Sequence, residues 1–518
     1  IINTFLVALS IFFTACKKDK IIAKEETPPP TSNRDELTKD SIFLYAKQVY
    51  LWNAELPTYT LFNPRQYKGS DNITNLNAEL FALTRYGKNA ATGLPYEYNP
   101  EYTDETKYSF IEDLAAEGKL AFLKNKQSSV DFNGEGNDFG FSVILLGKSS
   151  AYDVFLRFVS PGSPAALAGL GRGVKIEKIN GRAIGTNYNG GEDVFINNAL
   201  NANSINIAGK KLSGSSFDVN LTKAKYESSP IFKDTVLVNG GKKIGYLAYA
   251  RFTDDKNSEA ALTNVFSKFS GAGVTDLVVD LRYNPGGYVS TAEHLINLIA
   301  PSSLNGKTMF EQTYNATMQA GLATILKNQP QRDQQGALIY NNGRLLTYAD
   351  ESFKKSDNRT LFSKEGSLDN ISKVVFITTD GTASSSELVI NSLKPFLTVK
   401  TVGSTSYGKP VGFFPIRIDK YDLYLSSFST TNANGDGNYF AGIKPDAERD
   451  DDVSKDFGDP SETSLSAAIS FLTNGKFTTS SGGKTVNSAK SVGSSNNVLK
   501  VYEPAVLKGM VATPEGEK

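Results

Sequence analysis

Apolar residues recur along this chain with three spacings, and each spacing predicts a different kind of structure. Between Asp35 and Phe122 they recur every three or four residues, notably over 42–52 and 111–115, which predicts a small helical N-terminal domain over residues 35–136 with Trp52 in its core. From about Asn137 they alternate, which predicts strands at 139–146 and 154–159. Continuous apolar runs at 244–249, 277–281 and 374–377 are then followed by helical patterns, as in an α/β layer structure spanning 232–475.

A turn of small residues joins one of these apolar runs to a helical pattern. Residues 382–387 read Thr-Ala-Ser-Ser-Ser-Glu, directly before apolar positions 388, 389, 393 and 396. This arrangement places Ser384 at a helix N-terminus, where backbone N–H groups and the helix dipole stabilise negative charge. Ser385 and Ser386 are chemically possible nucleophiles as well, and only the spacing to Lys409, 25 residues after Ser384, favours Ser384.

A serine nucleophile needs a base, and this chain favours lysine over histidine in that role. His294 is the one histidine among 518 residues, and we expect it to be structural. A lysine accepts a proton only when neutral, so its pKa must fall from about 10.4 to about 7, which burial away from carboxylates achieves. The residues around Lys409, from Tyr407 to Phe414, carry no other charge. Lys409 is therefore the candidate general base.

Acyl transfer also needs donors for the developing oxyanion. Pro285-Gly286-Gly287 follows the apolar run 277–281 and presents unhindered backbone N–H groups. The N–H of Ser385 or of Ala383, at the predicted helix start, is a second source. Gly286, Gly287 and Ser385 are thus the candidate oxyanion hole.

A second motif precedes this region. Residues 160–181 read Ser-Pro-Gly-Ser-Pro-Ala-Ala-Leu-Ala-Gly-Leu-Gly-Arg-Gly-Val-Lys-Ile-Glu-Lys-Ile-Asn-Gly, which closely resembles a PDZ domain of the kind found in bacterial proteases. PDZ domains bind a peptide as an added strand and hold its C-terminal carboxylate on backbone N–H groups. The resemblance implies a PDZ domain over 137–225, with Phe139, Gly140, Phe141 and Ser142 as the peptide-binding loop. The alternative is that this module has only a structural role and binds no peptide.

Composition limits the partners and indicates a location. Lys plus Arg and Asp plus Glu both number 55, so the zero formal charge gives no reason to expect a nucleic-acid partner. Residues 1–15 are apolar and are followed by Cys16, the one cysteine, which resembles a bacterial lipoprotein signal peptide with a lipidation site. Residues 16–34 form a Pro-rich tether, and 476–518 a Ser/Gly-rich linker and C-terminal tail. We expect a lipid-anchored protein of the bacterial cell envelope, on the periplasmic side or the outer-membrane surface.

Together these motifs resemble the C-terminal processing peptidases, the tail-specific proteases of peptidase family S41, and most nearly their PDZ-containing lipoprotein members from Bacteroidetes. The resemblance implies a multidomain α+β protein with a ClpP/crotonase-like α/β protease core, preceded by a PDZ domain and a helical domain. It also implies serine endopeptidase activity through Ser384 and Lys409, protein substrates bound by their C-termini, and no metal or cofactor. One departure concerns Phe413, where many members have a glutamine that orients the lysine. Glu387, Asn391 and Asn284 are the candidates for that third role.

Two other functions are weighed against this one. A catalytically silent peptide-binding scaffold of the same fold is supported only by the missing glutamine. A penicillin-binding type of hydrolase needs the lysine three residues after the serine, and that position holds Glu387.

Overall fold

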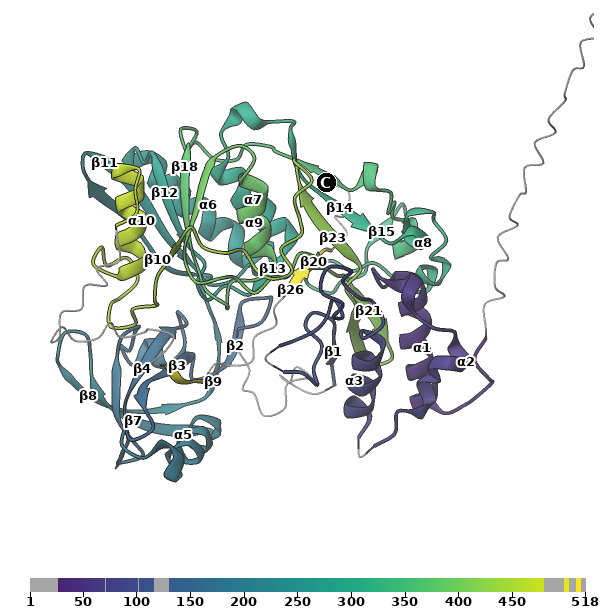
Figure 1. Ribbon diagram of the computed structural model, residues 1–518, viewed down its shortest axis with the longest axis horizontal. Coiled ribbons are helices and arrows are strands. Elements are labelled where there is room, and N and C mark those ends of the chain that lie inside the picture. The colour runs from purple at the N-terminus through teal and green to yellow at the C-terminus, as the bar shows by residue number, and fades with distance from the viewer. Residues whose placement is uncertain are drawn as a thin grey trace, which may run out of the picture.

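A central sheet, a smaller sheet and a helical region make up the architecture (Figure 1). The computed structural model describes residues 27–69, 71–100, 102–115, 130–478, 498–502 and 509–513. The expected signal peptide, Cys16 and most of the tether lie outside these residues. No helix within these ranges has the length and apolar character needed to cross a bilayer.

The N-terminal region is helical at its start. Asn33 accepts hydrogen bonds from the N–H groups of Asp35 and Glu36 and so caps the first helix. Apolar residues of these helices, such as Phe43 and Leu80, share one hydrophobic cluster with Phe414 of the central region. The helical elements are α1 (Arg34–Val49), η1 (Asn53–Glu55), α2 (Tyr59–Phe62), η2 (Pro64–Gln66) and α3 (Asn72–Leu83).

The expected helix around 111–115 is wrong. Residues Phe110–Asp113 form strand β1, which pairs antiparallel with β22 (Tyr421–Tyr424), itself paired with β21 (Pro415–Ile418). Ile111 is buried whereas Leu114 is 44% exposed, so the two do not share a helix face. Phe110 stacks on Tyr424 with ring centroids 4.4 Å apart. This distant partner outweighs the local spacing.

Residues 135–227 form a second unit with its own hydrophobic cluster. Its main sheet has the order β25-β3-β4-β5-β7-β8, with β6 beside β5, and β2 pairs separately with β9. Asn180 and Gly181 both have positive φ, as the expected tight hairpin turn requires. The elements are β2 (Glu135–Asp138), β3 (Phe141–Lys148), β4 (Ala151–Val159), α4 (Pro164–Leu167), β5 (Lys175–Ile179), β6 (Arg182–Ala183), η3 (Tyr188–Gly190), α5 (Glu192–Asn201), β7 (Ser204–Lys210), β8 (Ser216–Thr222), β9 (Ala224–Glu227) and β25 (Val498–Tyr502).

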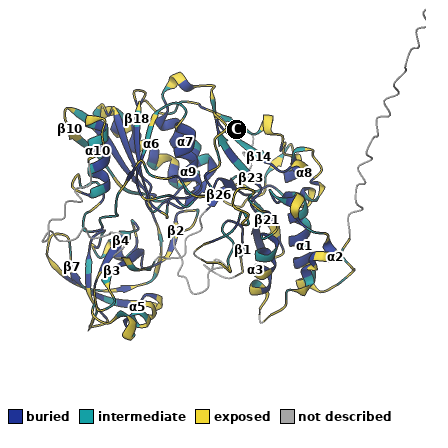
Figure 2. Ribbon diagram, in the orientation of Figure 1, coloured by how far each residue is buried: buried dark blue, intermediate teal, exposed yellow. Residues whose placement is uncertain are grey.

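The central sheet has the order β10-β11-β12-β18-β19-β24, with β10 antiparallel and the other pairs parallel. Successive residues face opposite layers, as in any strand. Leu277 and Val279 belong to the cluster that includes α6, α7 and α9, and Val278 to the cluster that includes α10. The strands are therefore buried on both faces, as their continuous apolar runs predict (Figure 2). The elements are β10 (Ile231–Asn239), β11 (Lys242–Tyr249), α6 (Asp255–Ala272), β12 (Asp276–Asp280), α7 (Val289–Ile299), β18 (Lys373–Thr378), α9 (Ser385–Leu393), β19 (Thr398–Gly403), β24 (Ala447–Glu448) and α10 (Thr463–Asn474).

Smaller sheets connect this core to the helical region. A four-stranded sheet has the order β17-β14-β23-β20, and β13 pairs parallel with β26. The remaining elements are β13 (Gly286–Tyr288), η4 (Ser302–Leu304), β14 (Thr308–Tyr314), α8 (Ala316–Gln319), η5 (Thr324–Asn328), β15 (Tyr340–Asn341), β16 (Arg344–Leu345), η6 (Tyr348–Asp350), η7 (Lys355–Asp357), β17 (Arg359–Leu361), β20 (Val411–Gly412), β23 (Phe428–Asn432) and β26 (Gly509–Val511).

A buried ion-pair network joins the second unit to the core. Arg172 Nη2 lies 2.5 Å from Asp451 Oδ1, and Arg282 Nη1 lies 2.9 Å from the same oxygen. Asp451 also accepts a hydrogen bond from the Tyr283 hydroxyl. Burial by itself raises the pKa of Asp451, but Arg172 and Arg282 outweigh it and hold the pKa well below its usual range.

Replacing Asp451 with asparagine is expected to lower Tm at pH 7 by roughly 6–12 °C, because the buried Arg172 guanidinium loses its carboxylate partner, at about 3 kcal/mol, whereas Arg282 keeps Asp280 and Glu462. Since the folded-state pKa of Asp451 is depressed, its contribution is fully present above about pH 4 and is lost as the pH falls through the folded value. Thermal melts from pH 7 to 3 should therefore show a constant Tm difference between the two proteins down to about pH 4, and only the start of convergence below it. Asp153→Asn is the control, because Asp153 pairs with Lys175 at the exposed surface and its loss should cost under about 2 °C. Equal losses in both variants would contradict this account.

Candidate active site

The serine turn is strained and buried. Ser384 ends the turn between β18 and α9 and has φ 60° and ψ −113°, a conformation that costs a residue with a side chain on the order of 1–3 kcal/mol. Its relative exposure is 0%. Such a conformation persists only where the surroundings fix it.

Hydrogen bonding separates the three adjacent serines. Ser385 Oγ donates to the Gly287 carbonyl at 2.8 Å, and Ser386 Oγ donates to the Asn284 carbonyl at 3.0 Å. These bonds tie the start of α9 to the glycine turn. Ser384 Oγ, in contrast, has no hydrogen-bond partner among the described residues. The structure thus distinguishes the three hydroxyls, which the sequence alone does only by spacing.

Glu387 connects the serine turn to the lysine segment. Its Oε2 accepts the backbone N–H groups of both Ser384, at 2.9 Å, and Lys409, at 2.8 Å. Its Oε1 accepts from Ser406 Oγ at 2.5 Å and from the Gly408 N–H at 2.7 Å. Burial raises the pKa of the Glu387 carboxyl, and these four hydrogen bonds partly offset the rise. One carboxylate therefore fixes the backbone at both candidate catalytic residues.

The other two candidates for orienting Lys409, Asn284 and Asn391, form hydrogen bonds to other segments. Asn284 donates from Nδ2 to the Tyr249 carbonyl and accepts the Gly286 N–H on Oδ1, so it shapes the glycine turn. Asn391 donates to the Asp436 carbonyl from the last part of α9.

Lys409 is fully buried, and two aromatic rings lie near its ammonium group. Its Nζ lies 4.1 Å from the centroid of the Phe413 ring, the residue that replaces the expected glutamine, and 5.8 Å from the Tyr108 ring. It also donates to the Tyr108 carbonyl at 3.5 Å. Tyr108 comes from the N-terminal region, just before β1, and no sequence motif pointed to it.

The glycine turn is conformationally specialised. Gly286 has φ 99° and Gly287 φ 146°, and a Cβ on Gly287 would stand 1.8 Å from the Phe252 carbonyl oxygen. A Cβ on Gly286 would stand 2.9 Å from Ser384 Cβ, so only glycine lets the turn approach the serine this closely. The Gly286 N–H is already bonded to Asn284. Gly287 is therefore the better of the two candidates for an oxyanion donor.

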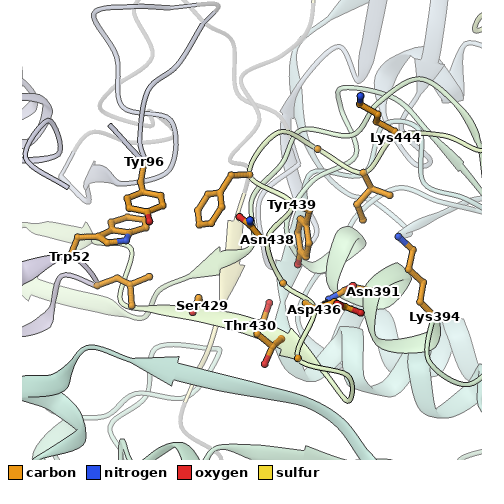
Figure 3. Close-up of a pocket in the computed structure, with 17 residues that line it drawn as sticks. Trp52, Tyr96, Asn391, Lys394, Ser429, Thr430, Asp436, Asn438, Tyr439 and Lys444 are labelled. Carbon is orange, nitrogen blue, oxygen red and sulfur yellow. Dashed lines mark hydrogen bonds between the residues drawn. The ribbon is translucent and has the colours of Figure 1, made fainter. Parts of the chain in front are cut away.

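A cleft is lined by residues of α9, of β23 and of the segment 435–444 (Figure 3). It has a volume of about 810 Å³. Trp52 and Tyr96 stack at one side, with ring centroids 4.4 Å apart, and Lys394 and Lys444 lie at the other. Trp52 is therefore partly exposed at a cleft wall and does not sit in the core of a separate helical domain. The cleft lining includes Phe440, whose carbonyl oxygen would lie 2.5 Å from a Cβ on Gly408.

His294 is bonded to residues outside the serine site. Its Nδ1 lies 2.5 Å from Glu365 Oε2, and its Nε2 lies 3.2 Å from Thr263 Oγ1 and 3.3 Å from the Glu259 carbonyl. Burial lowers the pKa of His294, but the bond to Glu365 outweighs that effect and the pKa is raised. Among the described residues, no group of three His, Cys, Asp or Glu side chains is arranged to hold a metal ion.

The expected peptide-binding loop lies at the start of β3. Phe139 and Phe141 are buried in the second unit, and Ser142 Oγ donates to the Tyr502 carbonyl at 3.3 Å. The Gly140 N–H and the Tyr226 hydroxyl bond the Asp138 carboxyl, whose pKa burial raises to about 6. The edge of β3 beside this loop is paired with β25.

Part of this chain is similar to a known peptidase family. Residues 243–449 match the model of peptidase family S41. The chain is 24% identical over 320 residues to a chloroplastic C-terminal processing peptidase of Tetradesmus obliquus, covering 59% of this chain and 58% of that protein. It is 25% identical over 371 residues to the carboxy-terminal processing protease CtpB of Bacillus subtilis (strain 168), covering 67% and 64%. The chain thus spans about three fifths of the length of these relatives.

A solved structure shares the fold. A putative S41 protease from Bacteroides fragilis NCTC 9343 superposes with a TM-score of 0.55 at 22% identity, over 86% of this chain and 99% of that one. The mixed α/β fold expected from the sequence is therefore that of a known S41 structure. The matched family segment contains Gly286, Gly287, Ser384, Glu387 and Lys409.

Proposed function

We propose that this protein is a serine endopeptidase of the C-terminal processing type, with Ser384 as nucleophile and Lys409 as general base. The observation that supports the proposal best is the environment and backbone conformation of Ser384. Its Oγ is buried and unbonded at a strained helix N-terminus, and one oxygen of Glu387 holds its backbone together with that of Lys409. Strained, precisely held residues of this kind concentrate at active sites.

In this mechanism neutral Lys409 takes the proton from Ser384 Oγ as the oxygen attacks a peptide carbonyl carbon. The same proton passes to the leaving amine as the carbon–nitrogen bond breaks, which leaves an acyl-enzyme. Water then hydrolyses the ester and regenerates both groups. Complete burial of the Lys409 side chain among aromatic rings favours the neutral amine, whereas the Phe413 ring face favours the ammonium form. Glu387 acts as a positioning residue, because it holds the backbones and does not enter the proton transfer.

The oxyanion would bind to the N–H groups of Gly287 and Ser385. Ser385 opens α9, and the first N–H groups of a helix have no partner within it. Ser385 Oγ donates a hydrogen bond to the Gly287 carbonyl, which fixes the N–H groups of Gly287 and Ser385 relative to each other.

A fluorophosphonate probe tests this function directly. We expect covalent labelling at Ser384, located by mass spectrometry of the digest, together with hydrolysis of casein. A protein that binds peptides but takes no label in any form, including one lacking residues 498–518, would be the catalytically silent scaffold. This second candidate function is supported by Phe413, which stands where a glutamine is expected.

We further propose that the second unit is a PDZ module that recruits substrate by its C-terminus. The addition of β25 to the edge of β3 supports the peptide-binding part. A substrate ending in alanine, valine or leucine is then expected to be cleaved at least about threefold faster than the same substrate with an amidated end, because the amide removes the charge that backbone N–H groups bind. Competition between the two forms in one reaction measures the ratio. Equal cleavage rates for the free and the amidated substrate would mean that the second unit has only a structural role.

Location in the bacterial envelope through lipid on Cys16 is likewise a proposal. Its support is the apolar stretch 1–15 directly before a lone cysteine. Cys16→Ser is expected to move most of the protein from the membrane pellet to the soluble fraction, because stable anchoring of this kind depends on the acyl chains. Fractionation with immunoblotting measures the shift, with Ser41→Ala on α1 as the control. Continued membrane association of the Cys16 variant would contradict the proposal.

A further inference from the structure

Two stretches of the C-terminal region lie at places that a substrate would need, the edge of β3 and the serine turn. Strand β25 is the added edge strand of the second unit, antiparallel to β3, with Tyr502 opposite Val143. The Tyr502 hydroxyl donates to the Asp193 carbonyl on α5, so this residue links β3 to α5. The added strand thus lies where a PDZ module would bind a peptide.

The second stretch, β26, lies beside the serine turn. Strand β26 lies between β13 and the segment after β20 (Figure 1). On one side the Gly509 N–H donates to the Pro285 carbonyl at 3.2 Å. On the other, the Phe413 N–H donates to the Met510 carbonyl and the Ala512 N–H to the Phe413 carbonyl, both at 3.0 Å. The backbone of 509–512 is therefore held along both edges, as an extended substrate would be.

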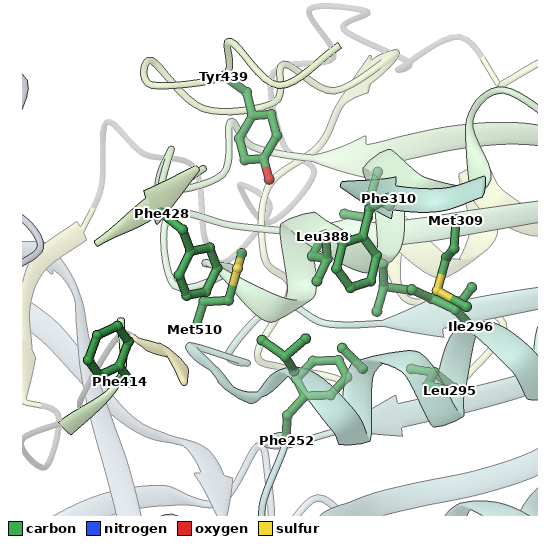
Figure 4. Close-up of a cluster of buried hydrophobic side chains, with 14 of the residues drawn as sticks. Phe252, Leu295, Ile296, Met309, Phe310, Leu388, Phe414, Phe428, Tyr439 and Met510 are labelled. Atoms are coloured by element: carbon green, nitrogen blue, oxygen red, sulfur yellow. The ribbon is translucent and has the colours of Figure 1, made fainter. Parts of the chain in front are cut away.

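Two side chains of β26 are buried in hydrophobic clusters. Met510 is 0% exposed and lies beside Phe428 in the main hydrophobic cluster (Figure 4). Val511 is 4% exposed and packs in a cluster with Tyr288 and Phe413. The residue before them is glycine, and a Cβ on Gly509 would stand 3.2 Å from the Phe413 ring, so this position favours a small residue.

The carbonyl of Gly509 lies next to the serine turn. The position of a Cβ on Gly286 would be 2.4 Å from the Gly509 oxygen and 2.9 Å from Ser384 Cβ. With β26 in place, Ser384 and Lys409 are both 0% exposed. Neither an external peptide nor a hydrolytic water reaches Ser384 Oγ in this arrangement.

We propose that residues 498–502 and 509–513 form an intramolecular inhibitory tail that covers the β3 edge and the serine turn together. The inference rests on the proposed function, and it defines the substrate segment as a small residue followed by two apolar ones. Because the tail is part of the same chain, it competes at an effective concentration on the order of millimolar. A substrate must displace it to be cleaved.

The experiment compares the full chain with a chain truncated after Asn497 and with the full-length variant Met510→Asp. The matched control is Leu61→Asp, the same apolar-to-acid change at a 75% exposed site on α2. Fluorophosphonate labelling is expected to be at least about tenfold faster in the truncated chain and in Met510→Asp, and unchanged in Leu61→Asp. A synthetic peptide of residues 498–513 should slow labelling of the truncated chain, and its Met510→Asp version should do so at least about tenfold less well.

Direct binding separates failure of this inference from failure of the proposed function. In the Ser384→Ala background the fluorescent 498–513 peptide should bind the truncated chain at least about tenfold more tightly than the full chain, whether or not the enzyme is active. Equal binding, or measurable labelling at equal rates with and without the tail, would overturn the inhibitory role. Loss of residues after Gly509 in the wild-type chain but not in Ser384→Ala, seen in the intact mass, would also overturn it, because the tail would then be a substrate. Met510→Asp keeps the test valid if the truncated chain does not fold.

Discussion

Replacing Ser384 with alanine is expected to lower peptide hydrolysis by at least about 10³-fold while changing Tm by less than about 2 °C. The catalytic loss follows because the nucleophile is absent, leaving only oxyanion stabilisation and binding. The small change in stability follows because Ser384 Oγ makes no hydrogen bond and alanine keeps the Cβ. Initial rates on a fluorogenic peptide and a thermal melt provide the two measurements.

The neighbouring serines are the matched controls for this prediction. Ser385→Ala and Ser386→Ala each lose one buried hydrogen bond, at a cost of about 1 kcal/mol, and should still be labelled by fluorophosphonate at Ser384. Lys409→Arg should be as inactive as Lys409→Ala, because guanidinium does not release its proton near neutral pH. Activity lost in a His294→Ala variant that still folds, but kept in Lys409→Ala, would show the mechanism to be wrong.

Local patterns predicted the core more accurately than the connections between distant segments. The apolar runs 277–281 and 374–377 became β12 and β18, because strands covered on both faces need apolar side chains at nearly every position. The segment around Ile111 was misassigned, because its partner strand β22 lies more than 300 residues away in the sequence. Tyr108 and Met510 were not identified for the same reason. Each reaches the site through tertiary pairing, which leaves no local spacing to detect.

The site itself was only partly predictable. Small residues before a helical pattern pointed to the serine turn, but the sequence could not rank the three hydroxyls by their hydrogen bonds. Glu387 was one of three candidates for the residue that orients the lysine. Its position three residues after Ser384 does not reveal that its carboxylate also binds the N–H of Lys409, which lies 22 residues further along the chain. The family resemblance predicted a glutamine at the position of Phe413. The structure has an aromatic ring beside the ammonium group there, and a carboxylate orders the backbone.

Removing the Glu387 side chain is expected to have the second largest effect. In Glu387→Ala four buried donors lose their acceptor, at about 1–3 kcal/mol each, so the serine and lysine segments are no longer held together. We expect Tm to fall by more than about 8 °C and kcat by at least about 10²-fold. The donors are Ser384 N–H, Lys409 N–H, Gly408 N–H and Ser406 Oγ.

Glu387→Gln distinguishes positioning from general destabilisation. The amide oxygen can keep the Ser384 and Lys409 N–H groups, while the amide nitrogen faces the Gly408 N–H and leaves that donor unpaired. We therefore expect about 1–3 kcal/mol of lost stability, a smaller fall in kcat than in the alanine variant, and an unchanged KM. Ser392→Ala is the control, because Ser392 is buried on the same helix and its Oγ has no partner among the described residues. If Glu387→Gln and Glu387→Ala lose kcat equally while differing in Tm, Glu387 takes part in proton transfer and is not only a positioning residue.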